Sequence, residues 1–177
     1  LVHGLWLTKE RSYCRPDLEA MHKRVKHDVG KFRESGRRLE DIAACVLMDE
    51  PTGQPATFMA KDEAYRVQFR AWLKSKFLTP EDLLVSNWDE VLPVVETERD
   101  QFPALHYYTQ LFRTRALGNF MTTQKRIIED AYGHSFPTIV NFSDGAIYHA
   151  NFCSQGVDYF ELLDDDDQNA IWGEDWA

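Results

Sequence analysis

An apolar run of strand length stops abruptly within the sequence Ala43-Ala44-Cys45-Val46-Leu47-Met48-Asp49-Glu50-Pro51-Thr52-Gly53. A short apolar run that is closed by Pro and Gly is typical of a buried strand whose C-terminal end opens into a loop. In parallel α/β folds that end of the strand carries the chemistry. Asp49 and Glu50 are therefore the first candidates for functional residues.

Helical patterns alternate with short apolar runs along the rest of the chain. Apolar residues at three- and four-residue spacing predict three helices, from Leu18 to the breaker Ser35-Gly36, over 62–77 and over 104–132. Thr79-Pro80 predicts a further helix start, with Thr79 as the N-cap. Shorter runs predict strands at 2–7, 137–142 and 170–172, a short helix at 156–163 and an irregular segment at 91–103. This order indicates parallel βαβ units, which fit half of a (β/α)8 barrel as well as a small doubly wound sheet.

The composition narrows the class of protein. The chain has 177 residues, 44% of them hydrophobic, and a net charge of -9. This length suits one domain over residues 1–177, and the acidic balance argues against nucleic acid as a partner. No run approaches membrane-spanning length. Three widely spaced cysteines indicate neither a disulfide framework nor a zinc site. The sequence calls for no metal and no cofactor, since the run Asp164–Asp167 lacks the spacers of a calcium loop.

Each of the last three predicted strands ends beside polar, mostly acidic residues, which are Asp49-Glu50, then Asn141 with Asp144, and then Glu174-Asp175. Carboxylates that converge at one rim suit glycoside hydrolysis, or magnesium binding for phosphoryl chemistry. No Gly-rich phosphate loop follows any strand, which weakens the magnesium alternative. Trp88 and Trp172 fall near presumed loops, where aromatic faces suit sugar stacking, although core packing explains a single Trp equally well.

Several segments, in order, resemble family 42 β-galactosidases. Val46–Gly53 resembles the segment of that family in which a strand ends in Asn-Glu. Residues 69–77 read Phe-Arg-Ala-Trp-Leu-Lys-Ser-Lys-Phe and are similar to the family's Phe-Arg-x-Trp-Leu-x-x-Lys-Tyr. Further similar segments follow at Asn87-Trp88, Gln124–Ile128, Thr138–Phe142, Asp158–Phe160 and Ala170–Trp172.

The resemblance implies a retaining β-galactosidase-like glycosidase on a (β/α)8 TIM barrel with parallel strands and outer helices. The chain would be a fragment that covers about the third to sixth β/α units. Glu50 takes the place of the general acid/base, and the nucleophile would lie beyond Ala177. Asp49, Asn141, Trp88 and Trp172 would contact a carbohydrate substrate. The resemblance leaves open whether the complete enzyme is a homo-oligomer. The cellular compartment is unknown, because the sequence begins at Leu1 and not at a methionine.

Two residues depart from the family pattern. The family's Asn before the acid/base is Asp49 here, and its aromatic residue after the Glu is Pro51. An ionised aspartate only accepts hydrogen bonds, whereas asparagine also donates them. A non-catalytic carbohydrate-binding barrel is therefore the alternative expectation.

Overall fold

The computed structural model describes residues 2–4, 12–142, 156–159 and 170–173. Four strands form one parallel sheet in the order β1-β2-β3-β4. Strands that follow one another in the chain are therefore neighbours in the sheet. The strands are β1 (Val2–Gly4), β2 (Ala44–Asp49), β3 (Thr138–Phe142) and β4 (Ala170–Gly173).

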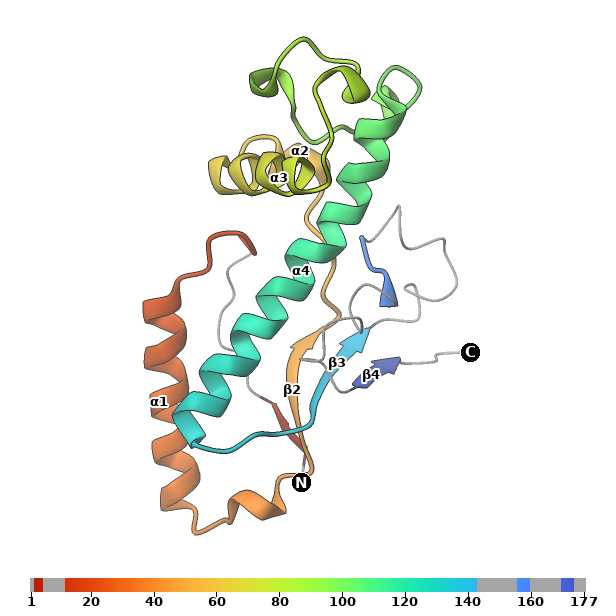
Figure 1. Cartoon of the computed structure of the whole chain (residues 1–177). Helices are drawn as coiled ribbons and strands as arrows, with labels where there is room; N and C mark the ends of the chain where they lie inside the picture. The colour runs from red at the N-terminus through yellow and green to blue at the C-terminus, as the bar shows by residue number, and fades with distance from the viewer. Residues whose placement is uncertain (1, 5–11, 143–155, 160–169, 174–177) are drawn as a thin grey trace.

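Helix α1 (Leu18–Glu34) connects β1 to β2 and confirms the first predicted helix. Asp17 caps its N-terminus, because the Asp17 carboxylate accepts a 2.9 Å hydrogen bond from the Ala20 amide. The predicted apolar stripe is buried and consists of Met21, Val25, Val29 and Phe32. Helix α1 lies beside the longest helix on one side of the sheet (Figure 1).

That longest helix, α4 (Pro103–Tyr132), has 30 residues and runs from the sheet to the far end of the molecule (Figure 1). Pro103 occupies its first turn, and Gly133, at φ 66°, ends it in the left-handed conformation that glycine tolerates best. The C-terminal half packs on α1, where the Phe32 and Tyr132 rings lie 5.7 Å apart. The predicted helix over 104–132 is thus confirmed within one residue.

Helix α3 (Glu63–Ser75) confirms the helix predicted over 62–77, and Asp62 caps it. Its buried stripe of Tyr65, Phe69 and Leu73 faces α4, and the Phe69 and Phe112 rings lie 5.2 Å apart. The short helix α2 (Ala56–Met59), which the sequence did not predict, precedes it.

Two helix predictions need correction. The helix expected from Thr79 is only a 3-10 turn, η2 (Glu81–Leu83), because Leu84 adopts a left-handed φ of 60°. Pro80 occupies the N-cap position, and the Thr79 hydroxyl donates a 2.9 Å hydrogen bond to the Asp82 carboxylate. The helix expected at 156–163 does not begin at Gly156, whose φ of +63° is not helical. Only Tyr159 of its described part is helical, and 160–163 fall outside the described residues.

Residues 91–102 are irregular, as predicted, apart from the 3-10 turn η4 (Glu96–Glu98). This segment, with η2 and the 3-10 turn η3 (Trp88–Glu90), lies beside α3 and the N-terminal end of α4, away from the strands (Figure 1).

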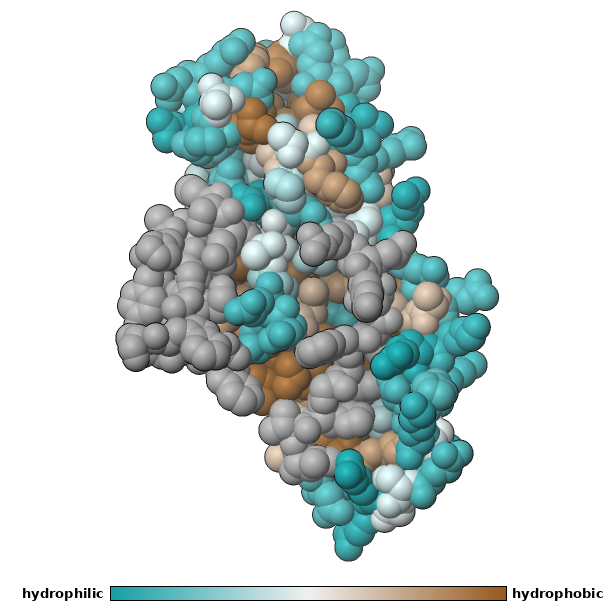
Figure 2. Space-filling model, turned by 180° about the vertical axis from the view of Figure 1, so that it is seen from behind, coloured by the Kyte–Doolittle hydropathy of each residue, from teal (hydrophilic) through white to brown (hydrophobic). Residues whose placement is uncertain are grey.

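The two faces of the sheet are covered to different extents. On the face toward the helices, Cys45, Val140 and Phe142 are buried. On the opposite face, Val46 and Ile139 are only half-buried. Figure 2, seen from behind, shows hydrophobic surface in the lower half of the molecule between the residues drawn in grey.

Candidate functional site at the strand ends

Three of the residues predicted to form the site lie in one row across the sheet. The register pairs Asp49 of β2 with Asn141 of β3, and Asn141 with Trp172 of β4. The Asn141 side-chain amide donates a 2.7 Å hydrogen bond from Nδ2 to Oδ1 of Asp49. Asn141 is buried and Asp49 is exposed, so the pair joins the edge of the core to the surface at the C-terminal ends of the strands.

An irregularity in β2 directs Asp49 to its face of the sheet. Between Val46 and Met48 the register with β3 shifts by one residue, so that Leu47 is the extra residue of a β-bulge. Successive side chains of a strand point to opposite faces, and one extra residue reverses the alternation beyond it. Without the bulge, Asp49 would share the helix-covered face with Cys45. With it, Asp49 and Asn141 share the open face with Val46 and Ile139.

Glu50 stands where the strand turns into a loop. Its backbone amide donates a 2.7 Å hydrogen bond to the Asn141 carbonyl, and its side chain is exposed. Its φ of 44° is left-handed, which costs a non-glycine residue about 1–2 kcal/mol. Pro51 follows and disfavours the ordinary helical conformation for Glu50. The fold therefore holds Glu50 in a specific, strained turn, as is common at functional sites.

The loop after β2, residues Glu50–Pro55, is named here the Glu50 loop. Two distant side chains bind its carbonyl groups. The Tyr13 hydroxyl donates a 2.9 Å hydrogen bond to the Thr52 carbonyl. The Arg113 guanidinium, from the middle of α4, donates from Nε to the Gln54 carbonyl at 2.8 Å and from Nη2 to the Gly53 carbonyl at 3.3 Å.

The sequence reasoning missed Arg113. It counted only the apolar positions of the long helix. A signal was present, since His106, Gln110 and Arg113 follow one another at helical spacing and continue the apolar stripe that begins at Leu117.

Trp88 is not brought to this row. It lies in η3, and the ammonium of Lys74, from α3, stands 4.8 Å from the centre of its ring. Within the described residues, Trp88 thus packs against α3 and the core beside it. The predicted rim residues Asp144, Glu174 and Asp175 lie outside the described residues, so the full rim is not tested.

The described residues contain neither a cluster of metal ligands nor a membrane-spanning helix. Within them, no group of three His, Cys, Asp or Glu side chains is arranged to hold a metal ion. None of the helices in the same part of the chain combines the length and apolarity that a membrane span requires.

The thiol groups of two cysteines have strongly raised pKa values. Burial, with the Glu129 carboxylate nearby, raises the pKa of the Cys45 thiol to about 11. Burial and the charge of Asp62 raise the pKa of Cys14 to about 12. Both groups are therefore thiols rather than reactive thiolates at neutral pH.

These features define an α/β protein whose parallel sheet presents polar residues at the C-terminal ends of its strands. Two solved structures share this fold. They are the β-galactosidase from Rahnella sp. R3, with a TM-score of 0.64, and the β-galactosidase from the psychrophilic Marinomonas ef1, with a TM-score of 0.66. Each is 14% identical to this chain.

The matches cover 92% and 95% of this chain, but only 23% and 25% of the respective β-galactosidases. The chain thus spans about a quarter of the length of these proteins. No family profile matches the sequence, and no curated protein matches it either.

Proposed function

We propose that this chain is part of the catalytic (β/α)8 barrel of a glycoside hydrolase of the β-galactosidase type. Glu50 is the proton donor of a retaining mechanism on a β-linked sugar, and the nucleophile belongs to a strand beyond Ala177. The observation that carries the proposal is the row of Asp49, Asn141 and Trp172 beside Glu50 at the C-terminal ends of successive strands. The likeness in fold to two β-galactosidases supports it.

The strand order supports the barrel over a doubly wound sheet. In a (β/α)8 barrel each strand pairs with the next one in the chain, whereas a doubly wound sheet reverses its order at a switch point. Among the described strands the order β1-β2-β3-β4 runs without a reversal. These strands would be the third to sixth of the barrel, and the open face with Val46 and Ile139 would be its interior.

The proposed chemistry assigns each residue a role. Glu50 gives its proton to the leaving glycosidic oxygen and then takes a proton from water when the glycosyl intermediate is hydrolysed. Asn141 holds Asp49 through the 2.7 Å hydrogen bond, and Asp49 accepts a hydrogen bond from a sugar hydroxyl. Trp172 is the proposed stacking residue for the sugar, whereas Trp88, in η3 beside α3, lies away from the row.

The test is Glu50→Gln in the protein encoded by the complete reading frame, assayed with aryl β-galactosides. Glutamine keeps the shape of the side chain but cannot act as an acid, so turnover of substrates with poor leaving groups should fall at least about 100-fold. Glu34→Gln, an exposed position at the end of α1, is the matched control. Unchanged turnover in the Glu50 variant would refute the assignment.

A non-catalytic carbohydrate-binding barrel is the second candidate. The observation in its favour is Asp49 itself, a carboxylate where the resembling family has an asparagine. Calorimetry that detects galactoside binding, together with no hydrolysis over hours, would establish this alternative and exclude the first.

A further inference from the structure

We infer that Arg113 is a positioning residue for the proposed acid/base, and that Gln110 and His106 set its orientation. Arg113 holds the Glu50 loop to the middle of α4, so the geometry of Glu50 depends on a side chain that touches no substrate. This inference rests on the proposed function, and its experiment is chosen so that the two can fail separately.

Arg113 is buried, with only 7% of its surface exposed. Its Nε and Nη2 atoms donate to the carbonyls of Gln54 and Gly53, and its Nη1 donates to Oε1 of Gln110 at 2.6 Å. A rigid planar fork can hold two successive carbonyls and an amide at once, which the single ammonium of lysine cannot do in the same geometry. The two carbonyls follow Glu50 by three and four residues.

The Glu50 loop also packs closely against Arg113. A Cβ at Gly53 would lie 2.6 Å from the Gly156 carbonyl oxygen and 3.1 Å from Cβ of Arg113. A Cβ at Gly156 would lie 2.9 Å from Nε of Arg113. Gly53, Gly156 and Arg113 are therefore in mutual close contact, and no side chain fits at either glycine position.

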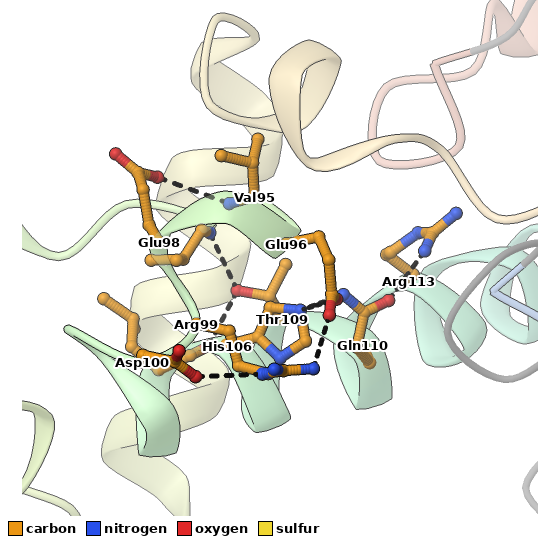
Figure 3. A network of polar contacts seen from close by, with 11 residues as sticks. Val95, Glu96, Glu98, Arg99, Asp100, His106, Thr109, Gln110 and Arg113 are labelled. Carbon is orange, nitrogen blue, oxygen red and sulfur yellow. Dashed lines mark hydrogen bonds and ion pairs between the residues drawn. The ribbon is translucent and has the colours of Figure 1, made fainter.

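A second set of contacts, on the side away from the Glu50 loop, orients the Arg113 guanidinium. Because Oε1 of Gln110 accepts from Arg113, its Nε2 faces Nε2 of His106, at 3.1 Å (Figure 3). The same His106 nitrogen lies 2.9 Å from Oε2 of Glu96, in η4 (Figure 3). One ring nitrogen cannot accept a hydrogen bond from Gln110 and donate one to Glu96 at the same time, so the polar chain that reaches the Glu50 loop runs from His106 through Gln110 to Arg113.

A cavity of about 200 Å³ borders this chain. It is lined by Pro55 at the end of the Glu50 loop, by Thr57 of α2, by Gln110 and Arg113 of α4, and by Glu96. The space gives Arg113 room to move if Gln110 no longer holds it, so Gln110 matters for the orientation and not only for the burial of Arg113.

Misplacement of Glu50 should reduce acid catalysis more than sugar binding, because a displacement of about 1 Å at a catalytic group can cost about 100-fold in rate. Substrates with poor leaving groups depend on the proton from Glu50, whereas those with very good leaving groups depend on it little. The ratio of activities on phenyl and 2,4-dinitrophenyl β-galactosides therefore reports the position of the acid.

The experiment compares Arg113→Lys and Gln110→Met with Arg126→Lys, an exposed arginine on the same helix, in the complete protein. Deuterium uptake of the peptide that covers residues 50–55 should rise at least about 10-fold in rate in the first two variants. The amides of α1 serve as the internal reference and should not change. Unchanged uptake in the loop, or an equal rise in α1, would overturn the inference.

The activity ratio is the second readout. Arg113→Lys should lose at least about 10-fold more kcat/KM on the phenyl than on the dinitrophenyl galactoside, because kcat/KM reports the step in which the leaving group departs. An equal loss on both substrates would overturn the positioning role. If the unaltered protein hydrolyses neither galactoside, the proposed function fails, and the exchange comparison alone decides whether Arg113 holds the loop.

Discussion

The contact between Gly53 and Gly156 gives a prediction whose size follows from the structure. In Gly53→Ala the new methyl group would lie 2.6 Å from the Gly156 carbonyl oxygen, and 3.1 Å from both Gly156 Cα and Arg113 Cβ. Two of these three atoms are backbone, so the strain cannot be relieved by a rotamer change. Gly53 has no positive φ, so the effect of the substitution is steric and not conformational.

Overpacking of this kind costs about 1–3 kcal/mol. The alanine also lowers the entropy of the unfolded chain, which returns about 0.4–1 kcal/mol. The midpoints of these two ranges leave a net loss of about 1 kcal/mol, which for a chain of 177 residues lowers the Tm by about 2–4 °C.

Gly30→Ala is the matched control, because no atom lies within 4 Å of the position of its Cβ in α1. Alanine in a helix interior is favoured over glycine by about 1 kcal/mol, so this variant should melt at the same or a higher temperature. Thermal unfolding followed by circular dichroism measures both. A Gly53→Ala variant that melts no lower than the unaltered protein would refute the close packing of the Glu50 loop on residue 156.

Three further outcomes are expected. Phe69→Ala, at a fully buried site, should lower the free energy of unfolding by about 3–5 kcal/mol in denaturant. Val67→Ala is the control, since Val67 is 57% exposed on the same helix, and it should change stability by less than about 0.5 kcal/mol. Equal effects would contradict the burial pattern of α3. Asn141→Leu removes the donor to Asp49 and should cost about 1–2 kcal/mol, and a double-mutant cycle with Asp49→Ala that finds no coupling would contradict their hydrogen bond. Because the pKa of Cys45 is raised to about 11 from 9.0, the folded state keeps a proton that the unfolded state releases, so stability should fall as the pH rises from 9 to 11; a Cys45→Ala variant with the same slope would contradict this cause.

The sequence predicted the elements whose signal is local. The helix from Leu18 and the helix over 104–132 follow from apolar spacing and from the breakers at Gly36 and Gly133. The convergence of Asp49 and Asn141 also followed, because the C-terminal ends of neighbouring parallel strands meet at one edge. To predict these features, one needs only the spacing of the apolar residues, the residues that end a helix, and the direction of the strands.

The failures have a common physical cause, which is that tertiary contacts decide the conformation of short segments. The turn at Glu81–Leu83 follows a threonine and a proline, as a helix start often does, yet it ends after one turn at Leu84. The extra residue Leu47 in β2 has no marker either, since a fully buried leucine in an apolar run reads as an ordinary strand residue. The face to which Asp49 points therefore could not be derived from the alternation of the strand.

The buried arginine answers a requirement that the Glu50 loop itself creates. Gly53 and Gln54 are buried, and their carbonyl groups point toward α4 rather than to solvent. A buried carbonyl without a donor costs about 1–3 kcal/mol, so an apolar side chain at position 113 would leave both groups at a penalty. Arg113 satisfies them from the middle of a 30-residue helix, which is a rigid element anchored at one end by α1 and at the other by the segment 91–102. The position of the loop that presents Glu50 is thereby tied to the longest rigid element of the described structure, and this is the arrangement that a precisely placed acid requires.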